Sequence, residues 1–239
     1  MTPENSPALL ELQWTRQGAA GDKCSVSQCI TVRLEDGSCF ACPAPMLQAG
    51  CRALADCLDD LLAKKRSGEE VELPLESLNT RTFVSVAIYL EHFYACSTST
   101  AVEGAVFPES SSNPTALSCP VELRELYRLD LWEHRFVVQQ LLALPREAWE
   151  YSEEGRWVDE TSKMGAQIMS QLDIPHLLRV LDAAVLLEII PLKALCGAVL
   201  GNTLLDFDEK HLLSFFGVTG EFGPEEEKEL LTAYPWLRV

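Results

Sequence analysis

Basic residues are scarce in this chain of 239 residues: 19 Lys and Arg stand against 36 Asp and Glu, and the formal net charge is −17. Nucleic acids and anionic membrane surfaces attract positive charge, so this balance argues against either as a direct partner. Long apolar runs are missing too, and none approaches the ~20 residues that a helix needs to span a bilayer. Because 47% of the residues are hydrophobic, a packed core is still expected.

A targeting signal is also missing from the first residues, MTPENSPALLELQW, which lack a basic region followed by an apolar block. We therefore expect no signal peptide. The nine cysteines are then expected to be reduced thiols of an intracellular protein.

The motifs of phosphate-cradling loops and of nucleophile elbows do not occur in the sequence. Cys39 and Cys42 form one C-x-x-C, but a zinc site needs four converging ligands. In a strand, residues three apart point to opposite faces, which favours packed or surface thiols over a shared metal. The acidic run Glu225–Glu227 fits a helix start better than a metal site.

Histidines are few and scattered, with no paired spacing that would suggest a metal or a catalytic base: His92, His134, His176 and His211. No catalytic residues, no metal site and no cofactor are predicted, and an enzyme is the least favoured class.

The first part of the chain, after a loose leader at 1–24, predicts a β-hairpin. Alternating apolar residues at 30–34 precede the turn Asp36-Gly37, and a second run at 39–42 ends at Pro43. Apolar spacing between residues 46 and 62 predicts one or two helices. Val71 to Leu75 alternates as a short strand, and residues 83–94 have helical spacing.

Residues 96–120 are rich in Ser, Thr, Pro and Gly, which predicts a flexible loop with little that could pack. A helical pattern returns between Leu123 and Leu144. The stretch that follows, with Trp149 and Trp157 among acids, has no clear pattern.

The last third, from about Leu172 to Val239, predicts a series of short amphipathic helices. Pro191 ends the first and could open the second, Asp208 caps a third, and Pro224 opens a fourth. Their apolar stripes suit either of two roles. They complete the protein's own core, or they leave an apolar face open for a partner.

Several stretches together resemble the Skp family, the adaptors related to elongin C that join F-box proteins to cullins in SCF-type ubiquitin ligases. The stretches are Leu34–Gly37, Glu70–Leu75, Leu131–Phe136 and, most extensively, Leu177 to Trp236. The resemblance implies an α+β protein with a BTB/POZ fold, a small three-stranded sheet with helices, followed by a C-terminal helical extension.

The resemblance also implies a domain organisation. A BTB/POZ-like domain would span 25–190, with the flexible loop at 96–120 and an insertion at about 140–170. The extension at 191–239 would form the F-box-binding layer. A structural cap and a new interface remain equally open as roles for the insertion.

By position in the family pattern, an F-box groove would be lined by eight apolar residues of the terminal helices: Leu178, Leu200, Leu204, Leu212, Phe216, Val218, Phe222 and Trp236. An F-box would supply helices that complete this apolar layer. The family works in the cytoplasm and nucleus, and its POZ face could also form a homodimer.

Two positions depart from the family. An asparagine-tyrosine pair helps the family to contact the cullin, whereas this chain has Val185 and Leu186 there. Apolar side chains cannot repeat those hydrogen bonds. Two functions follow: an adaptor that links F-box proteins to a cullin, or a Skp-like structural subunit bound to one F-box-like partner outside a ligase. Val185 and Leu186 favour the second.

Overall fold

A computed structural model describes residues 29–64, 71–94, 113–117, 126, 128–144, 173–204, 212–213 and 223–233. The predicted leader at 1–24 lies outside these residues. So do most of the loop at 96–120 and most of the insertion at about 140–170.

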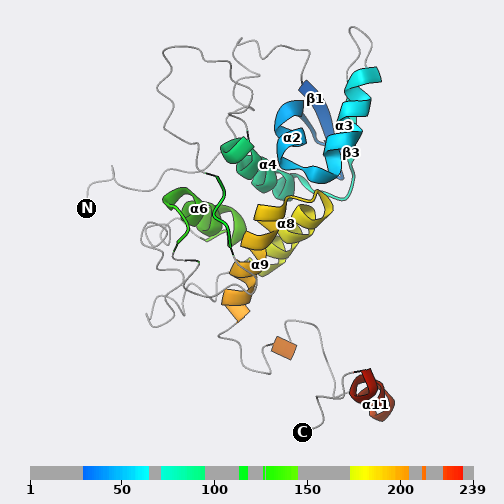
Figure 1. The fold of residues 1–239 in the computed structure, drawn as a ribbon, viewed down its shortest axis with the longest axis vertical. Coiled ribbons are helices and arrows are strands. Elements are labelled where there is room, and N and C mark those ends of the chain that lie inside the picture. The colour runs from blue at the N-terminus through cyan, green and yellow to red at the C-terminus, as the bar shows by residue number, and fades with distance from the viewer. Residues whose placement is uncertain are drawn as a thin grey trace, which may run out of the picture. The chain divides into compact units, whose positions relative to one another are not determined.

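A three-stranded sheet carries strands β1 (Cys29–Leu34), β2 (Cys39–Pro43) and β3 (Glu72–Leu75) in the order β2-β1-β3 (Figure 1). β1 and β2 form the predicted antiparallel hairpin, and β3 joins β1 in parallel. Gly37 has a φ of 78°, a left-handed conformation that glycine adopts at no steric cost. The N–H of Ser38 donates to Oδ1 of Asp36 at 2.9 Å and closes the turn. Pro74 lies in the edge strand β3, where a missing N–H is tolerated.

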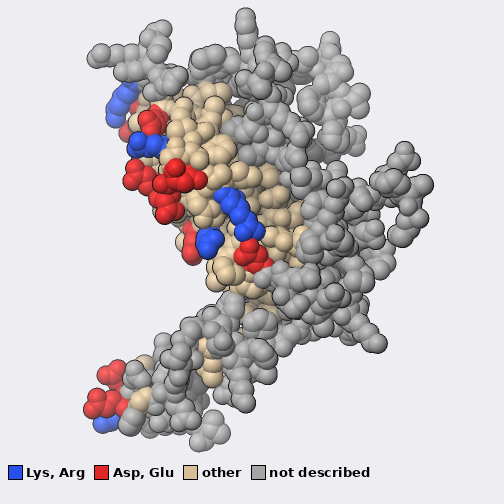
Figure 2. All heavy atoms as spheres, turned by 180° about the vertical axis from the view of Figure 1, so that it is seen from behind, with Lys and Arg blue, Asp and Glu red and all other residues tan. Residues whose placement is uncertain are grey.

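The sheet has one buried and one exposed face, as the alternation of residue types predicts. On the exposed face Arg33 pairs with Glu72 at 3.0 Å and with Glu76 at 3.4 Å. Figure 2 shows many charged side chains gathered along one margin of the tan surface, with a further group of basic and acidic side chains within that surface. The inner face is apolar and buried, through Ile30, Val32, Leu34, Cys42, Leu73 and Leu75.

The helices of the described residues are α2 (Ala44–Gly50), α3 (Arg52–Lys64), α4 (Thr80–Tyr94), α6 (Leu131–Phe136), α8 (Ile174–Leu186), α9 (Ile190–Leu204) and α11 (Pro224–Ala233), with a short π-helix, η4 (Val137–Leu141). The apolar pattern between residues 46 and 62 therefore forms two helices. The chain is α+β, as expected, with its sheet covered by helices on the buried side (Figure 1).

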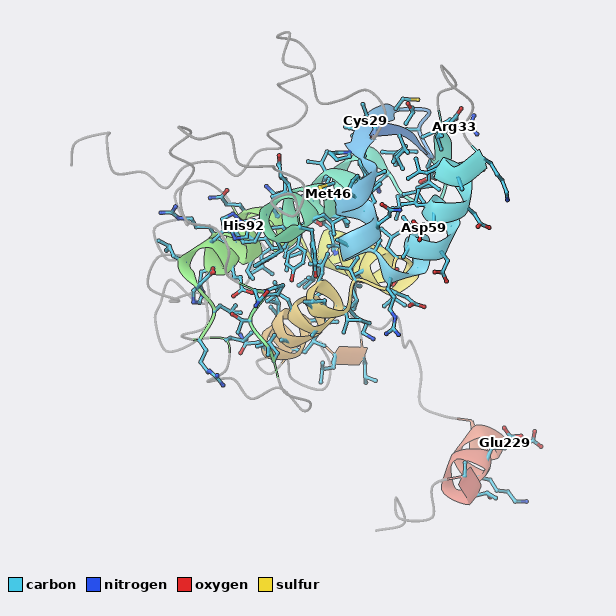
Figure 3. The ribbon with its side chains drawn as sticks, turned by 45° about the horizontal axis from the view of Figure 1, so that its top comes forward. Cys29, Arg33, Met46, Asp59, His92 and Glu229 are labelled. Carbon is cyan, nitrogen blue, oxygen red and sulfur yellow. The ribbon has the colours of Figure 1, made fainter. Side chains whose placement is uncertain are left out.

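An aromatic cluster joins α4 to α6. The rings of His92 and Trp132 are stacked, with centroids 3.7 Å apart and planes 4° apart, and Trp132 also stacks on Phe136 at 5.2 Å. Tyr89 lies against Phe136 at 5.4 Å. Figure 3 shows where His92 lies on α4. Such ring pairs add to the free energy gained by burying the rings, so they fix α6 against α4.

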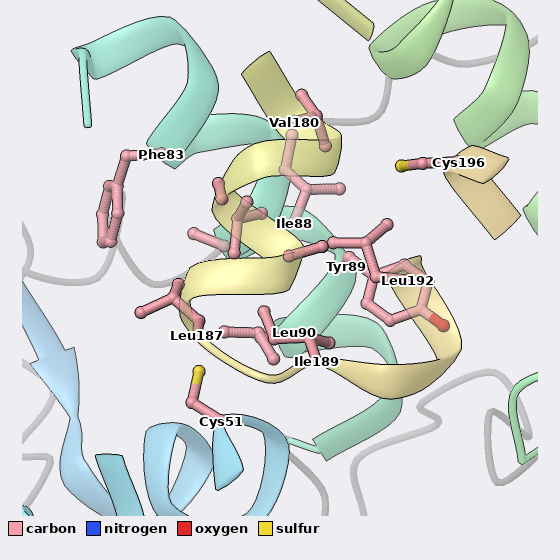
Figure 4. Packing of buried hydrophobic residues seen from close by; sticks show 14 of the residues in the cluster. Cys51, Phe83, Ile88, Tyr89, Leu90, Val180, Leu187, Ile189, Leu192 and Cys196 are labelled. Atoms are coloured by element: carbon pink, nitrogen blue, oxygen red, sulfur yellow. The ribbon is translucent and has the colours of Figure 1, made fainter. Parts of the chain in front are cut away.

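The first two terminal helices contribute to the core. Leu177, Leu192, Leu195 and Val199 are buried with residues of the sheet and of α4. Figure 4 shows residues of α4, α8 and α9 packed together, with Val180 and Leu192 among them. Each large side chain buried in this way stabilises the fold by about 1.5–3 kcal/mol. Of the two roles considered for the apolar stripes, these residues therefore have the first: they complete the protein's own core.

The chain divides into two compact units, residues 1–202 and 203–239. The sequence places a boundary at 190–191, whereas the first unit includes α9 as far as Asn202. The packing of Leu192, Leu195 and Val199 into the core accounts for this difference. In the second unit, α11 begins at Pro224, where the sequence predicts a helix start.

Five residues of the predicted flexible loop, 113–117, are described, and Thr115 and Leu117 among them pack. The N–H of Thr115 donates to the buried carboxylate of Glu133 at 2.9 Å, its hydroxyl donates to the same carboxylate, and Leu117 lies against the core. For this part of the loop the expectation of little packing is wrong, because a buried acid on α6 needs hydrogen-bond donors.

Candidate partner-binding surface

The turn between α8 and α9 exposes three neighbouring apolar side chains, which we call the α8–α9 corner: Val185, Leu186 and Ile190. They are 53%, 51% and 48% exposed. Among the described residues five large apolar side chains are exposed, and three of them belong to this corner. Exposed apolar side chains are common singly, whereas larger apolar patches are typical of surfaces that bind a partner, so the corner is the candidate surface of the described residues.

Buried residues hold the backbone of the corner in place. Leu187 and Ile189 alternate with the exposed residues and are buried near Leu90 and Cys51 (Figure 4). The N–H of Ile189 donates to the carbonyl of Ala184 at 2.9 Å. The carbonyl of Leu187 accepts from the N–H of Ala53 at 3.3 Å, which ties the turn to the start of α3. A surface fixed in this way loses little conformational entropy when a partner binds.

Glu188, at the centre of the turn, has a φ of 52°. This left-handed conformation is uncommon for a residue other than Gly, Asn, Asp or His. It lets α8 end and α9 begin within three residues, with Leu187 and Ile189 both turned inward. Strain of this kind persists only where the surrounding packing imposes it.

A groove runs beside α8 and ends at the corner. Its volume is about 390 Å³, and it is lined by the turn before α4, by α4 and by α8, through Ser77, Leu78, Asn79, Thr82, Arg179, Asp182, Ala183 and Leu186. Arg179 and Asp182 contribute the charges and Leu186 an exposed apolar side chain. The side-chain amide oxygen of Asn79 accepts from the N–H of Thr82 at 2.9 Å, which caps α4. The hydroxyl of Thr82 is buried and has no hydrogen-bond partner.

The residues predicted to line an F-box groove fall in both units. Leu178 on α8 is half-buried, and Leu200 on α9 is half-buried against the core of the first unit. Leu204 and Leu212 belong to the second unit and are half-buried. None of these four lines the groove described above. Phe216, Val218, Phe222 and Trp236 lie outside the described residues.

The spacing of Ile174, Leu177, Leu178, Leu181 and Val185 predicts one apolar stripe on the first terminal helix, but Val185 is exposed. The buried face of the helix runs through Ile174, Leu177, Val180 and Ala184, so Val185 points away from the core. Ile190, Arg179 and Asp182 were not singled out from the sequence. A stricter projection of α8 at 100° per residue separates Arg179, Asp182 and Leu186 from the buried face.

One buried cluster contains a serine and a histidine in contact. Oγ of Ser85 lies 3.3 Å from Nε2 of His176, which lies 2.9 Å from the carbonyl oxygen of Gln140. A carbonyl only accepts, so Nε2 carries the proton and cannot take one from Ser85. Both side chains are buried. The cluster joins α4, η4 and α8.

Burial shifts the pKa of three histidines and of the Cys51 thiol. It lowers the pKa of His92, His134 and His176 below the ordinary value. It raises the pKa of the Cys51 thiol to about 12. As predicted for residues three apart in one strand, Cys39 of β2 is exposed and Cys42 is buried. No group of three metal-ligating side chains occurs within the described ranges.

Neither a scan with protein-family models nor a comparison with curated proteins finds a match for the chain. None of the helices in the described residues combines the length and the apolar character needed to cross a bilayer.

Proposed function

We propose that the chain is a non-catalytic adaptor of the Skp type, with a BTB/POZ-like body. It binds an F-box protein through its terminal helices and presents the α8–α9 corner to a second subunit. The order of elements supports this proposal: a hairpin, two helices, a parallel third strand and a further helix follow one another as the resemblance implies. The protein is then expected in the cytoplasm and nucleus.

The exposure of the α8–α9 corner is the observation on which the proposal depends most. Val185 and Leu186 occupy the positions at which the Skp family contacts its cullin, and more than half of each side chain is exposed. Covering a preformed apolar surface of this kind stabilises a complex. Large apolar side chains at the centre of such an interface dominate the affinity.

A second function is favoured by the chemistry of the same two residues. The family has asparagine and tyrosine there, which form hydrogen bonds, whereas Val185 and Leu186 cannot. Permanent interfaces are more apolar than transient ones. A Skp-like structural subunit, bound permanently within an assembly that contains no cullin, therefore remains the alternative.

The F-box part of the proposal is tested by capturing F-box proteins with the purified full chain. Phe216→Ala combined with Trp236→Ala should abolish capture, because both residues stand at apolar anchor positions of the predicted groove. Leu131→Ala is a matched control, since Leu131 is an exposed apolar residue of the first unit. Capture by a double variant that remains folded would reject the F-box assignment.

The choice between the two functions follows from what copurifies with the tagged protein in cells. Several F-box proteins together with a cullin indicate the ligase adaptor. One stable partner without a cullin indicates the structural subunit. A complex that contains no F-box-like protein would exclude both.

A further inference from the structure

Four exposed residues of α8 form a single line along the helix, which we call the α8 stripe: Pro175, Arg179, Asp182 and Leu186. Their spacings of four, three and four residues place them on one face of a helix with 3.6 residues per turn. The stripe lies opposite the buried face that includes Val180 and Ala184.

The order of residue types along this stripe is apolar, positive, negative, apolar. A second α8 helix laid antiparallel against the first would present the reverse order. Each Arg179 would then face an Asp182, and each Leu186 would face Pro175. The stripe is therefore complementary to itself in both charge and apolar character.

The two charges have no ion pair within the described residues. Arg81 forms an ion pair with Asp173 at 2.6 Å, and Arg33 forms one with Glu72. Arg179 and Asp182 form no ion pair with any described residue. Three residues apart on one helix, they remain available to opposite charges on another surface. The half-buried Leu178 lies beside the stripe and extends its apolar end.

From this pattern we infer that α8 is the contact between two copies of this chain. The copies pair through a two-fold axis that crosses the helix between Arg179 and Asp182. Leu186 of each copy covers Pro175 and Leu178 of the other. The groove beside the stripe, which Arg179, Asp182 and Leu186 line, gives these side chains room to pack.

This pairing goes beyond the proposed function and does not require it. Leu186 belongs to both the α8 stripe and the α8–α9 corner, so a second copy and a different subunit exclude each other there. Self-association would keep Leu186 of the corner covered until that subunit binds.

The test is sedimentation of the purified full chain at several concentrations, with two opposite charge variants. Arg179→Asp makes both charges of the stripe acidic, and Asp182→Arg makes both basic. Wild type should dimerise reversibly, and each variant alone should dimerise at least about tenfold more weakly because like charges face each other. An equimolar mixture of the two variants should regain the dimer, since an acidic stripe then meets a basic one.

Lys64→Asp serves as the control, because Lys64 is an exposed lysine of α3 that pairs only loosely with Asp60, at 3.9 Å. It should dimerise like wild type. Leu186→Ser, which keeps both charges, should weaken the dimer in the mixture as well as alone. A wild type that stays monomeric, single charge variants that dimerise normally, or a mixture that does not regain the dimer would each overturn the inference.

Discussion

At the scale of single residues, Gly50 decides how closely α2 approaches α4. A Cβ at this position would lie 2.3 Å from Cδ2 of Leu90 and 3.0 Å from the ring of Tyr94. Leu90 is itself buried and cannot move aside freely. Overpacking should outweigh the gain in helix propensity, so Gly50→Ala should lower the free energy of unfolding by about 1–2 kcal/mol, measured by urea denaturation.

Gly197 gives the matched control, because a Cβ there meets nothing within 4 Å. It is an exposed residue inside α9. Gly197→Ala should therefore stabilise the protein by about 0.5–1 kcal/mol through helix propensity alone. Equal effects of the two substitutions would show that the approach of α2 to α4 is not the cause.

His176 makes stability depend on pH. Burial lowers its pKa, and the nearby Arg81 guanidinium lowers it further. The folded state therefore binds this proton more weakly than the unfolded chain, whose histidines titrate at about 6.5. The contribution of His176 to the free energy of unfolding is fully present above about pH 6.5 and decreases as the pH falls below that value. His92 and His134 act in the same direction.

The measurement is the urea midpoint at about pH 7.5 and at about pH 5.5 for wild type and His176→Gln. The glutamine keeps an N–H donor for the carbonyl of Gln140 but does not titrate. Wild type should lose more stability than the variant between the two pH values. Parallel losses in both proteins would mean that His176 is not responsible.

At the scale of elements, Glu133 organises the start of α6. Its N–H donates to Oδ1 of Asp130 at 2.7 Å, and its carboxylate accepts from the N–H of Asp130 at 3.2 Å, so the two residues form a capping box. The same carboxylate receives both donors of Thr115. Because Glu133 is only 2% exposed, Glu133→Ala would leave these donors without their charged partner.

We expect Glu133→Ala to cost about 2–3 kcal/mol in urea denaturation, since hydrogen bonds to a buried charge are the strong ones. Glu76→Ala is the control: Glu76 pairs with Arg33 on the exposed face of the sheet, and its loss should cost less than about 1 kcal/mol. If both substitutions lower the free energy of unfolding equally, the buried carboxylate of Glu133 does not stabilise the start of α6 in the way that its hydrogen bonds indicate.

The elements that the sequence predicts best are those with a clear period. Alternation around Asp36-Gly37 predicts the hairpin, and Pro224 with its acids predicts the start of α11. Side-chain orientation within α8 is harder to predict, because the helix is apolar on more than one face. Val185 and Val180 are the same residue type, and only tertiary packing decides which of them is buried.

Loop chemistry limits prediction in a different way. Ser and Thr between Pro and Gly indicate a loop, and most of the segment gives no further signal. Thr115 nevertheless packs, because its partner Glu133 lies 18 residues away in sequence. An acid on a helix is ordinarily expected to be exposed. Composition therefore does not reveal that Glu133 is buried and needs Thr115 as a hydrogen-bond donor.

At the scale of the whole molecule, the chain divides into two compact units at residue 202. The buried apolar residues of α8 and α9 complete the core of the first unit, whereas the residues after 202 belong to a second compact unit. Sequence period cannot distinguish a helix that closes a core from one that binds a partner, because both have the same pattern.

The most direct test of the adaptor proposal is cross-linking mass spectrometry of the tagged full chain, purified with its partners from cells. Two exposed lysines report on the two proposed surfaces: Lys193, one turn after Ile190 on α9, and Lys228 on α11. The proposal predicts cross-links from Lys228 to an F-box segment and from Lys193 to a different subunit. The proposal would be contradicted if both lysines were cross-linked only to this chain. It would also be contradicted if no cross-link from Lys228 reached a protein with an F-box.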